Sequence, residues 1–185
     1  MAIKIAVYGT GRDGRNFYYD HDPNYEIVCF IATKPRYGEL LYLPLYSFED
    51  FEKNYYNEHL LIVVANRKNQ GEIFGNLLNK CYRKGIDFIP FEWLEKQINY
   101  WEMRQVLSEN EALFLLRMRL DVEQKKLCVL YGNCQILSLA QYFLHCKDFC
   151  RNFLLFVIPP VYAFPSIKSQ DLLYENFWEL ASFFV

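Results

Sequence analysis

The sequence predicts an α/β protein built from parallel β-sheets and covering helices. Apolar runs of strand length alternate with segments of helical spacing along most of the 185 residues. This alternation favours parallel strands joined by right-handed crossovers. Of all residues, 52% are hydrophobic, which is enough to bury the core that such sheets require. Two strand-like runs end directly at a glycine-containing turn, at Gly9 and at Gly132.

Composition argues against several classes of partner. The net charge of -2 gives no indication of nucleic acid. No apolar run reaches the ~20 residues that cross a bilayer, and the first residues lead into a strand rather than a secretory signal. We therefore expect a cytoplasmic protein without a membrane span, in which most of the six cysteines are reduced and no structural metal site forms. Three cysteines are expected in the core: Cys29, Cys81 and Cys128.

Residues 1–91 are predicted to form a Rossmann-like domain with a parallel sheet. Its strands are expected at Ile3–Tyr8, 27–33, 60–65 and 86–90. Its helices are expected after Gly14, at 47–55, and through Ile73, Leu77, Leu78 and Cys81. Ser47 with Asp50 predicts an N-terminal cap, and Gly85 predicts the end of the last helix.

A G-x-G-x-x-G motif follows the first strand and opens the first helix. In dinucleotide-binding folds its glycines permit a tight turn, the approach of a phosphate, and close packing of helix on strand. The candidate ligand contacts are Gly9, Gly11, Arg12 and Gly14. The second strand ends in Ala32-Thr33 and lacks the acidic residue that holds a ribose, so an ordinary NAD site is not expected. Tight packing without any ligand explains the glycines equally well.

The order of motifs in this half resembles the PglD-type sugar-nucleotide-binding domain of bacterial sugar acyltransferases. The matching stretches are residues 5–11, 26–31, 38–40, 43–47 and 62–65. The resemblance implies a Rossmann-like fold, with a sugar nucleotide as the candidate ligand of this domain. In that group the second strand usually ends in Asp-Asn, whereas here it ends in Ala32-Thr33.

Residues 92–126 are predicted to form a helical connector between two domains. One helix is expected at 92–107, and a second from Ser108, where Glu111 completes a capping box, to about Leu120. Two tryptophans are expected as packing anchors: Trp93 and Trp101. Two arginines are expected on a solvated helix face: Arg117 and Arg119.

Residues 127–185 are predicted to form a second α/β domain. Strands are expected at 127–131 and Phe153–Ile158, and helices at 135–144 and 170–181. Gly132 permits a turn, and Cys134 stands where a helix begins. A helix N-terminus favours negative charge and lowers the pKa of a thiol, so Cys134 is a candidate nucleophile. A buried thiol that only fills the turn is the alternative.

The stretch Gly132-Asn133-Cys134-Gln135 after a strand resembles the WcbI family of capsular-polysaccharide proteins, over about residues 126–185. The resemblance implies a variant of the SGNH-hydrolase fold, of flavodoxin-like α/β type, in which Cys134 stands where the serine ends the first strand. It also implies coenzyme A or acetyl-CoA as ligand and donor, and acyl transfer to a polysaccharide or its sugar precursor.

Acyl transfer by a thiol needs a thiolate, a base and oxyanion donors. The backbone N–H groups of Cys134 and Gln135 are candidate donors, and Asn133 either adds a donor or tolerates a left-handed turn. His145 ends the helix that Cys134 begins, ~15 Å away at ~1.5 Å per residue, which is too far for a hydrogen bond. The other histidines lie in loops of the first domain: His21 and His59.

Three hypotheses follow, from different classes of protein. The first is an acyltransferase of capsular or surface polysaccharide biosynthesis that uses an acyl-CoA donor and a saccharide acceptor. The second is a non-catalytic module that binds a nucleotide, coenzyme A or a sugar nucleotide. The third and weakest is an NAD-linked oxidoreductase. The ending Phe-Phe-Val indicates a strand cut at its start, with a late catalytic block missing, and a docked terminal strand is the alternative.

Overall fold

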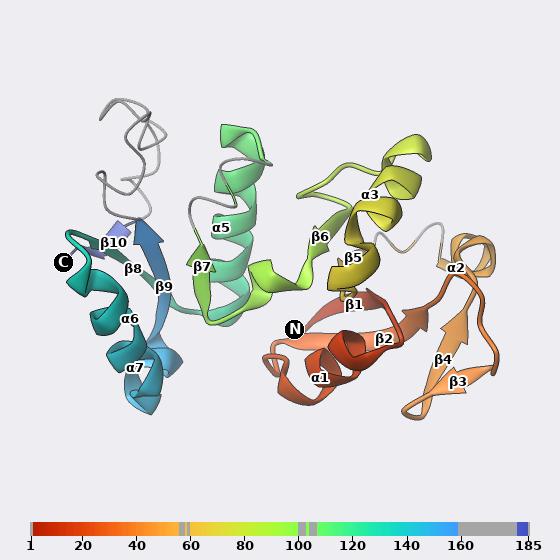
Figure 1. The fold of residues 1–185 in the computed structure, drawn as a ribbon, viewed down its shortest axis with the longest axis horizontal. Helices are drawn as coiled ribbons and strands as arrows, with labels where there is room; N and C mark the ends of the chain where they lie inside the picture. The colour runs from red at the N-terminus through yellow and green to blue at the C-terminus, as the bar shows by residue number, and fades with distance from the viewer. Residues whose placement is uncertain are drawn as a thin grey trace. The chain divides into compact units, whose positions relative to one another are not determined.

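A computed structural model describes residues 2–55, 58, 60–99, 103, 107–158 and 181–184 of the chain. The chain divides into two compact units, Met1–Phe91 and Glu92–Val185, each containing a mostly parallel sheet and several helices (Figure 1). The prediction of an α/β protein with parallel sheets is therefore confirmed. Each unit is described below by itself.

The first unit contains a six-stranded sheet of order β3-β4-β2-β1-β5-β6. Its parallel strands are β1 (Ile3–Tyr8), β2 (Tyr25–Ile31), β4 (Leu43–Tyr46), β5 (Leu61–Val64) and β6 (Phe88–Pro90). The short edge strand β3 (Glu39–Leu40) runs antiparallel to β4. The four strands expected from the sequence are present, in the register Ile5↔Leu61 between β1 and β5.

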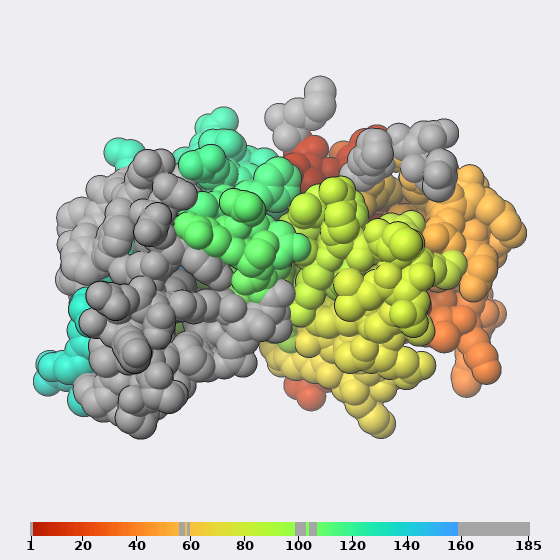
Figure 2. Space-filling view, turned by 90° about the horizontal axis from the view of Figure 1, so that it is seen from above, coloured from red at the N-terminus to blue at the C-terminus, as the bar shows by residue number. Residues whose placement is uncertain are grey.

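Helices cover both faces of this sheet. On one face, α2 (Phe48–Tyr55) and α3 (Gln70–Asn79) bury Phe48, Phe51, Ile73 and Leu77 against alternate strand residues such as Ala6 and Tyr8. On the other face, α1 (Arg12–Asp20) places Tyr18 against Phe30 of β2, with ring centroids 6.0 Å apart. The outer side of α3 is open to solvent, as the yellow surface in Figure 2 shows.

The end of α3 differs from the expectation. The helix stops at Asn79 and is capped by Lys80, not by Gly85. Cys81 follows in a left-handed conformation, φ 65°, and is exposed, so its expected place in the core was wrong. Gly85, at φ 87°, belongs instead to the tight turn that precedes β6, where its N–H donates to the Phe88 carbonyl.

The β3–β4 hairpin was missed from the sequence. Its two-residue loop consists of Leu41 and Tyr42, both left-handed at φ 53° and 65°. Hairpin loops of this kind normally carry Asn-Gly or a similar pair, because most side chains disfavour positive φ. Leu-Tyr therefore gave no turn signal, and Tyr42 stands 96% exposed at the tip.

The second unit contains a four-stranded parallel sheet of order β10-β8-β9-β7. The strands are β7 (Gln97–Asn99), β8 (Lys126–Tyr131), β9 (Phe153–Ile158) and β10 (Ala181–Phe184). Helices α6 (Gln135–His145) and α7 (Lys147–Asn152) pack on the face that presents Cys128 and Leu130. Helix α5 (Glu109–Glu123) lies on the other side of the sheet (Figure 1).

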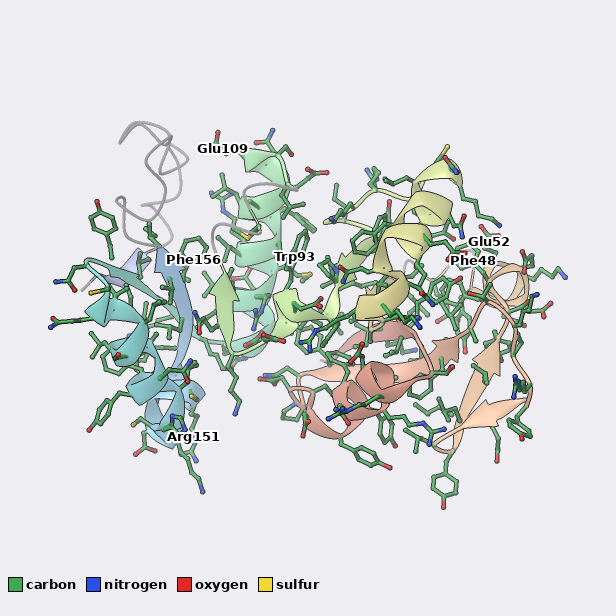
Figure 3. All side chains as sticks on the ribbon, in the orientation of Figure 1. Phe48, Glu52, Trp93, Glu109, Arg151 and Phe156 are labelled. Carbon is green, nitrogen blue, oxygen red and sulfur yellow. The ribbon has the colours of Figure 1, made fainter. Side chains whose placement is uncertain are left out.

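The first part of the helix expected at 92–107 is absent, because residues 92–99 are not α-helical, whereas Met103 is helical and most of the rest of that range lies outside the described residues. Residues Phe91–Leu94 form a short 3₁₀ helix, η2, and the strand β7 follows. The capping box is confirmed, because Ser108 Oγ accepts from Glu111 N while Glu111 Oε2 accepts from Ser108 N. Trp93 is buried beside α5 as expected (Figure 3), and Trp101 lies outside the described residues. The helix expected at 170–181 lies there too, except that Ala181 begins β10.

Arg119 is not on a solvated face, which corrects the expectation for this residue. Its side chain is buried and pairs with the carboxylate of Glu123, with Nε 2.7 Å from Oε1. Its Nη1 donates to the carbonyl oxygens of Trp93 at 2.6 Å and Glu95 at 3.1 Å. The guanidinium thus ties η2 and the approach to β7 onto α5.

Candidate thiol and glycine-turn sites

The candidate thiol Cys134 lies at the carboxyl end of β8, immediately before α6. Strand β8 has a neighbour on each side, so its end opens at the middle of the sheet edge. The chain passes from β7 across β9 to β8 and then returns to β9, which reverses the direction of winding at β8. Ligands of open parallel sheets bind at the carboxyl edge beside such a reversal.

The backbone around Cys134 is fixed by its neighbour Asn133. Asn133 Oδ1 accepts from Gln135 N at 3.0 Å, and the Asn133 carbonyl accepts from Ile136 N at 3.1 Å. The side chain is therefore an acceptor here, and Asn133 does not take a left-handed conformation. Because Asn133 already holds the Gln135 N–H, that group is not available as an oxyanion donor in this conformation.

Gly132 is explained by packing rather than by its backbone angle. A Cβ at this position would lie 3.2 Å from Ile136 Cδ1, closer than side chains normally approach. Gly132 therefore lets the turn lie directly on the first apolar residue of α6.

Accessibility separates Cys134 from the core thiols. Cys134 is exposed, which excludes the alternative of a buried thiol filling the turn. Cys29 and Cys128 are buried, as expected. Burial, with a smaller contribution from the charge of Glu58, raises the pKa of Cys29 to about 12. Burial raises the pKa of Cys128 to about 11.

A base for Cys134 is not found among the histidines that the structure describes. His145 lies at the far end of α6, where its Nδ1 is 2.7 Å from the Gln141 carbonyl. His21 lies in the first unit beside the Tyr18 carbonyl, and His59 is outside the described residues. Within the described parts of the chain, no group of three or more histidine, cysteine or acidic side chains could hold a metal ion.

Two of the three motif glycines are required by packing. Gly9 has φ +143°, and a Cβ there would lie 2.2 Å from the Ala65 carbonyl oxygen. A Cβ at Gly14 would lie 2.0 Å from the Gly9 carbonyl oxygen. Gly11 precedes α1 with φ -78°, and a Cβ there would meet nothing within 4 Å. Only Gly11 therefore leaves open space at the turn.

The first turn of α1 carries a carboxylate that faces the loop after β5. Asp13 Oδ2 accepts from Arg67 N at 3.0 Å, which links the loops that follow β1 and β5. These strands are adjacent, and the chain winds outward from them in opposite directions, so the contact crosses the place where a dinucleotide would bind. The charge of Asp13 opposes a phosphate there, and Arg12 is exposed nearby.

A cavity of about 350 Å³ lies between α2 and α3, next to the carboxyl ends of β1 and β2. Tyr8, Phe48 and Leu77 form its buried floor. Exposed polar residues surround it: Thr33, Glu49, Asn76, Asn79 and Lys80. Sequence reasoning missed this cavity, because its lining comes from four segments and forms no local motif.

No described helix is both long and apolar enough to cross a membrane. Comparisons of the chain with protein-family models, with curated proteins and with solved structures found no match.

Proposed function

We propose that the second unit performs acyl transfer from acyl-CoA to a saccharide of capsular or surface polysaccharide biosynthesis, with Cys134 as nucleophile or coenzyme A contact. The observation that carries this proposal is the position of Cys134. An exposed thiol stands at the carboxyl end of the central strand β8, at the start of an 11-residue helix. Helix N-termini favour negative charge, so the start of α6 suits an anionic nucleophile or ligand.

The proposed reaction has two steps. The Cys134 thiolate attacks the thioester carbonyl of the donor, its carbon–sulfur bond breaks, and coenzyme A leaves as a thiolate. A saccharide hydroxyl oxygen then attacks the acyl-cysteine, and the hydroxyl proton passes to the departing sulfur. Each step forms one bond and breaks one bond at the acyl carbon. The hydrogen bond from Gln135 N to Asn133 Oδ1 fixes the turn that carries Cys134, so the sulfur keeps its position in both steps.

Intact-protein mass spectrometry after incubation with acetyl-CoA tests the proposal. We expect one acetyl group, mapped to Cys134 and lost in Cys134→Ser. Cys146 is also exposed and precedes the short helix α7, so Cys146→Ser is the matched control that keeps the label. Equal acetylation at Cys146 and Cys81, or no acetylation of Cys134, would contradict a nucleophilic Cys134. Coenzyme A binding that is weakened in Cys134→Ser would then leave Cys134 as a ligand contact only, and unchanged binding would remove that role as well.

A second candidate function is a module in the first unit that binds a sugar nucleotide. The cavity between α2 and α3 favours it, because an aromatic floor with a rim of amides and a hydroxyl suits a hydroxylated ring. Asp13 at the glycine turn and Ala32-Thr33 after β2 give no support to an NAD-linked oxidoreductase. Calorimetry with a uridine diphosphate sugar tests this candidate, with Asn76→Leu as the variant expected to weaken binding.

A further inference from the structure

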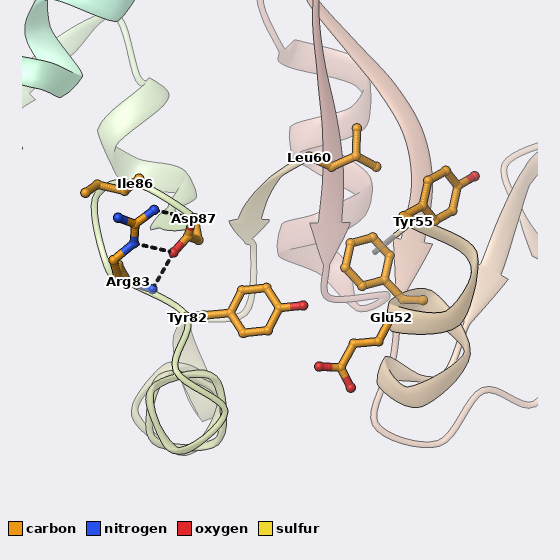
Figure 4. Close-up of a pocket in the computed structure, with 8 residues that line it drawn as sticks. Glu52, Tyr55, Leu60, Tyr82, Arg83, Ile86 and Asp87 are labelled. Atoms are coloured by element: carbon orange, nitrogen blue, oxygen red, sulfur yellow. Dashed lines mark hydrogen bonds and ion pairs between the residues drawn. The ribbon is translucent and has the colours of Figure 1, made fainter. Parts of the chain in front are cut away.

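A separate cavity of about 250 Å³ lies at the opposite edge of the first sheet, near the amino ends of β5 and β6 (Figure 4). Helix α2 forms one wall, and the loop between α3 and β6 forms the other. The lining residues are Phe51, Glu52, Tyr55, Leu60, Tyr82, Arg83, Ile86 and Asp87. This edge is remote from the glycine turn, which follows the carboxyl end of β1.

Three of the eight lining residues are aromatic: Phe51, Tyr55 and Tyr82. Phe51 and Tyr55 stack, with centroids 5.5 Å apart and planes 27° apart. Tyr82 packs edge-on against Phe48 at 5.5 Å. Tyr82 and Glu52 point into the gap from opposite walls, as Figure 4 shows. Burial is the main cause that raises the pKa of Tyr55 to about 12, so its hydroxyl stays protonated and the ring uncharged at neutral pH.

Two ion pairs set the charge at this cavity. Asp87 is saturated by Arg83, because its carboxylate accepts from Arg83 N at 2.8 Å, Nε at 2.9 Å and Nη2 at 3.2 Å. Glu52 pairs with Lys80 through Oε2 at 2.6 Å, and its other oxygen, Oε1, takes no part in this contact. Glu58 lies outside the lining, and its charge makes only the smallest contribution to the raised pKa of Tyr55. The lining itself therefore carries two carboxylates, those of Glu52 and Asp87, and one cation, Arg83.

An ammonium group already occupies the neighbouring position. Lys80 Nζ lies 4.7 Å from the centroid of the Phe48 ring while it bonds to Glu52. The cavity offers a cation the same two kinds of partner: the aromatic rings of Tyr82 and Phe51, and the carboxylate of Glu52. Aromatic rings attract cations through their negative faces, most strongly where water is excluded.

We propose that this cavity binds a small organic ammonium ion, with Tyr82 and Phe51 against the cation and Glu52 as its counter-charge. The volume is below that of cavities for drug-sized ligands, which are about 300 Å³ or more, so the ligand is small. Glu52 and Asp87 in the lining disfavour an anion. The site belongs to the first unit alone and does not depend on Cys134.

Titration of the full chain with choline, followed by amide NMR shifts, tests the proposal. Its uncharged isostere, 3,3-dimethylbutan-1-ol, is the matched control ligand, because it keeps the shape and removes the charge. We expect choline to bind with a millimolar Kd and to shift the amides of residues 82–87, and the isostere to bind about tenfold more weakly. Tyr82→Leu and Glu52→Gln are each expected to weaken choline binding about fivefold or more, whereas Tyr82→Phe keeps it.

Tyr19→Leu, an exposed tyrosine on the other helix layer, controls for nonspecific aromatic contacts. Thermal melts establish that each variant is folded. Equal binding of choline and its isostere would overturn the assignment of a cation. Choline binding that is unchanged in both Tyr82→Leu and Glu52→Gln, or no binding at all by the folded chain, would overturn the site.

Discussion

Arg119 and Glu123 form a buried ion pair one turn apart on α5, with Nε 2.7 Å from Oε1. The remaining carboxylate oxygen accepts from Lys125 Nζ at 2.9 Å, just before β8 begins. The arginine also satisfies the carbonyls of Trp93 and Glu95. The pair therefore connects the segment before β7 with the segment before β8.

Replacing Arg119 should strongly destabilise the second unit. Arg119→Met leaves the Glu123 carboxylate buried and two carbonyls without their donor, so we expect a loss of about 3 kcal/mol in the free energy of unfolding. Urea unfolding monitored by Trp fluorescence measures it. The control is Arg117→Met on the exposed face, expected to change stability by less than about 1 kcal/mol. Partial recovery is expected in the double variant Arg119→Met with Glu123→Leu. Equal effects of the two single arginine variants would refute the stabilising role of the buried Arg119.

The three motif glycines should differ sharply in their tolerance of alanine. Gly9→Ala and Gly14→Ala each force a Cβ against a carbonyl oxygen, so we expect losses of about 2 kcal/mol or more. Gly11→Ala meets open space at an ordinary φ and should be nearly neutral. Thermal denaturation of the three variants provides the comparison. If Gly11→Ala were as damaging as Gly14→Ala, the packing account of the motif would be wrong.

Thiol modification should divide the cysteines by burial. Near neutral pH we expect iodoacetamide to modify Cys134 in the folded chain and to spare Cys29 and Cys128, whose raised pKa values keep them protonated. Peptide mapping by mass spectrometry reads the sites. The same reaction in urea is the control, in which all three should react. Modification of Cys128 at the rate of Cys134 in the folded chain would count against this division.

Alkaline pH should destabilise the fold through the same buried thiols. Their folded pKa values, about 12 for Cys29 and about 11 for Cys128, lie above the ordinary value of 9.0. The unfolded chain therefore loses protons first, and stability that is fully present below pH 9 falls as pH rises towards 11. We expect a loss of about 1 kcal/mol per thiol near pH 10. Urea titrations at a series of pH values measure the slope, and Cys128→Ala should reduce it.

The hairpin tip should be improvable. Leu41 and Tyr42 both carry positive φ, which costs a side chain about 1 kcal/mol per residue. Replacing the pair by Asn-Gly should therefore stabilise the first unit by about 1 kcal/mol. Tyr37→Gly is the control, because Tyr37 is also exposed but lacks positive φ, and glycine there should destabilise. A fall in melting temperature for the Asn-Gly variant would show that the hairpin has another conformation.

The sequence predicted the central strands because continuous apolar runs, such as the one at β8, leave few alternatives. It did not predict β7 or the hairpin. Strand β7 is three residues long, and the segment before it is held by Arg119, which lies 24 residues after Glu95, so no local pattern marks it. An arginine in a predicted helix is assigned to the solvent-exposed face unless its buried partners are known. Two of the partners of Arg119 are backbone carbonyls, which the sequence does not identify.

The candidate sites were predictable in position but not in detail. A cysteine after an apolar run was enough to locate Cys134 at a strand end. Two details could not be predicted: the hydrogen bond from Gln135 N to the Asn133 side chain, and the one from Arg67 N to Asp13. The first depends on a side-chain rotamer, and the second depends on which loops the fold brings together. Both cavities are assembled from separate segments and required the fold.

The contacts of Gly9 with Ala65 and of Gly14 with Gly9 have an evolutionary consequence. Selection for folding alone would retain both glycines, even in a lineage whose first unit had lost every ligand. Their persistence among descendants would therefore carry no information about binding. Gly11 is under no such steric demand, so drift at that position would record when a ligand ceased to matter.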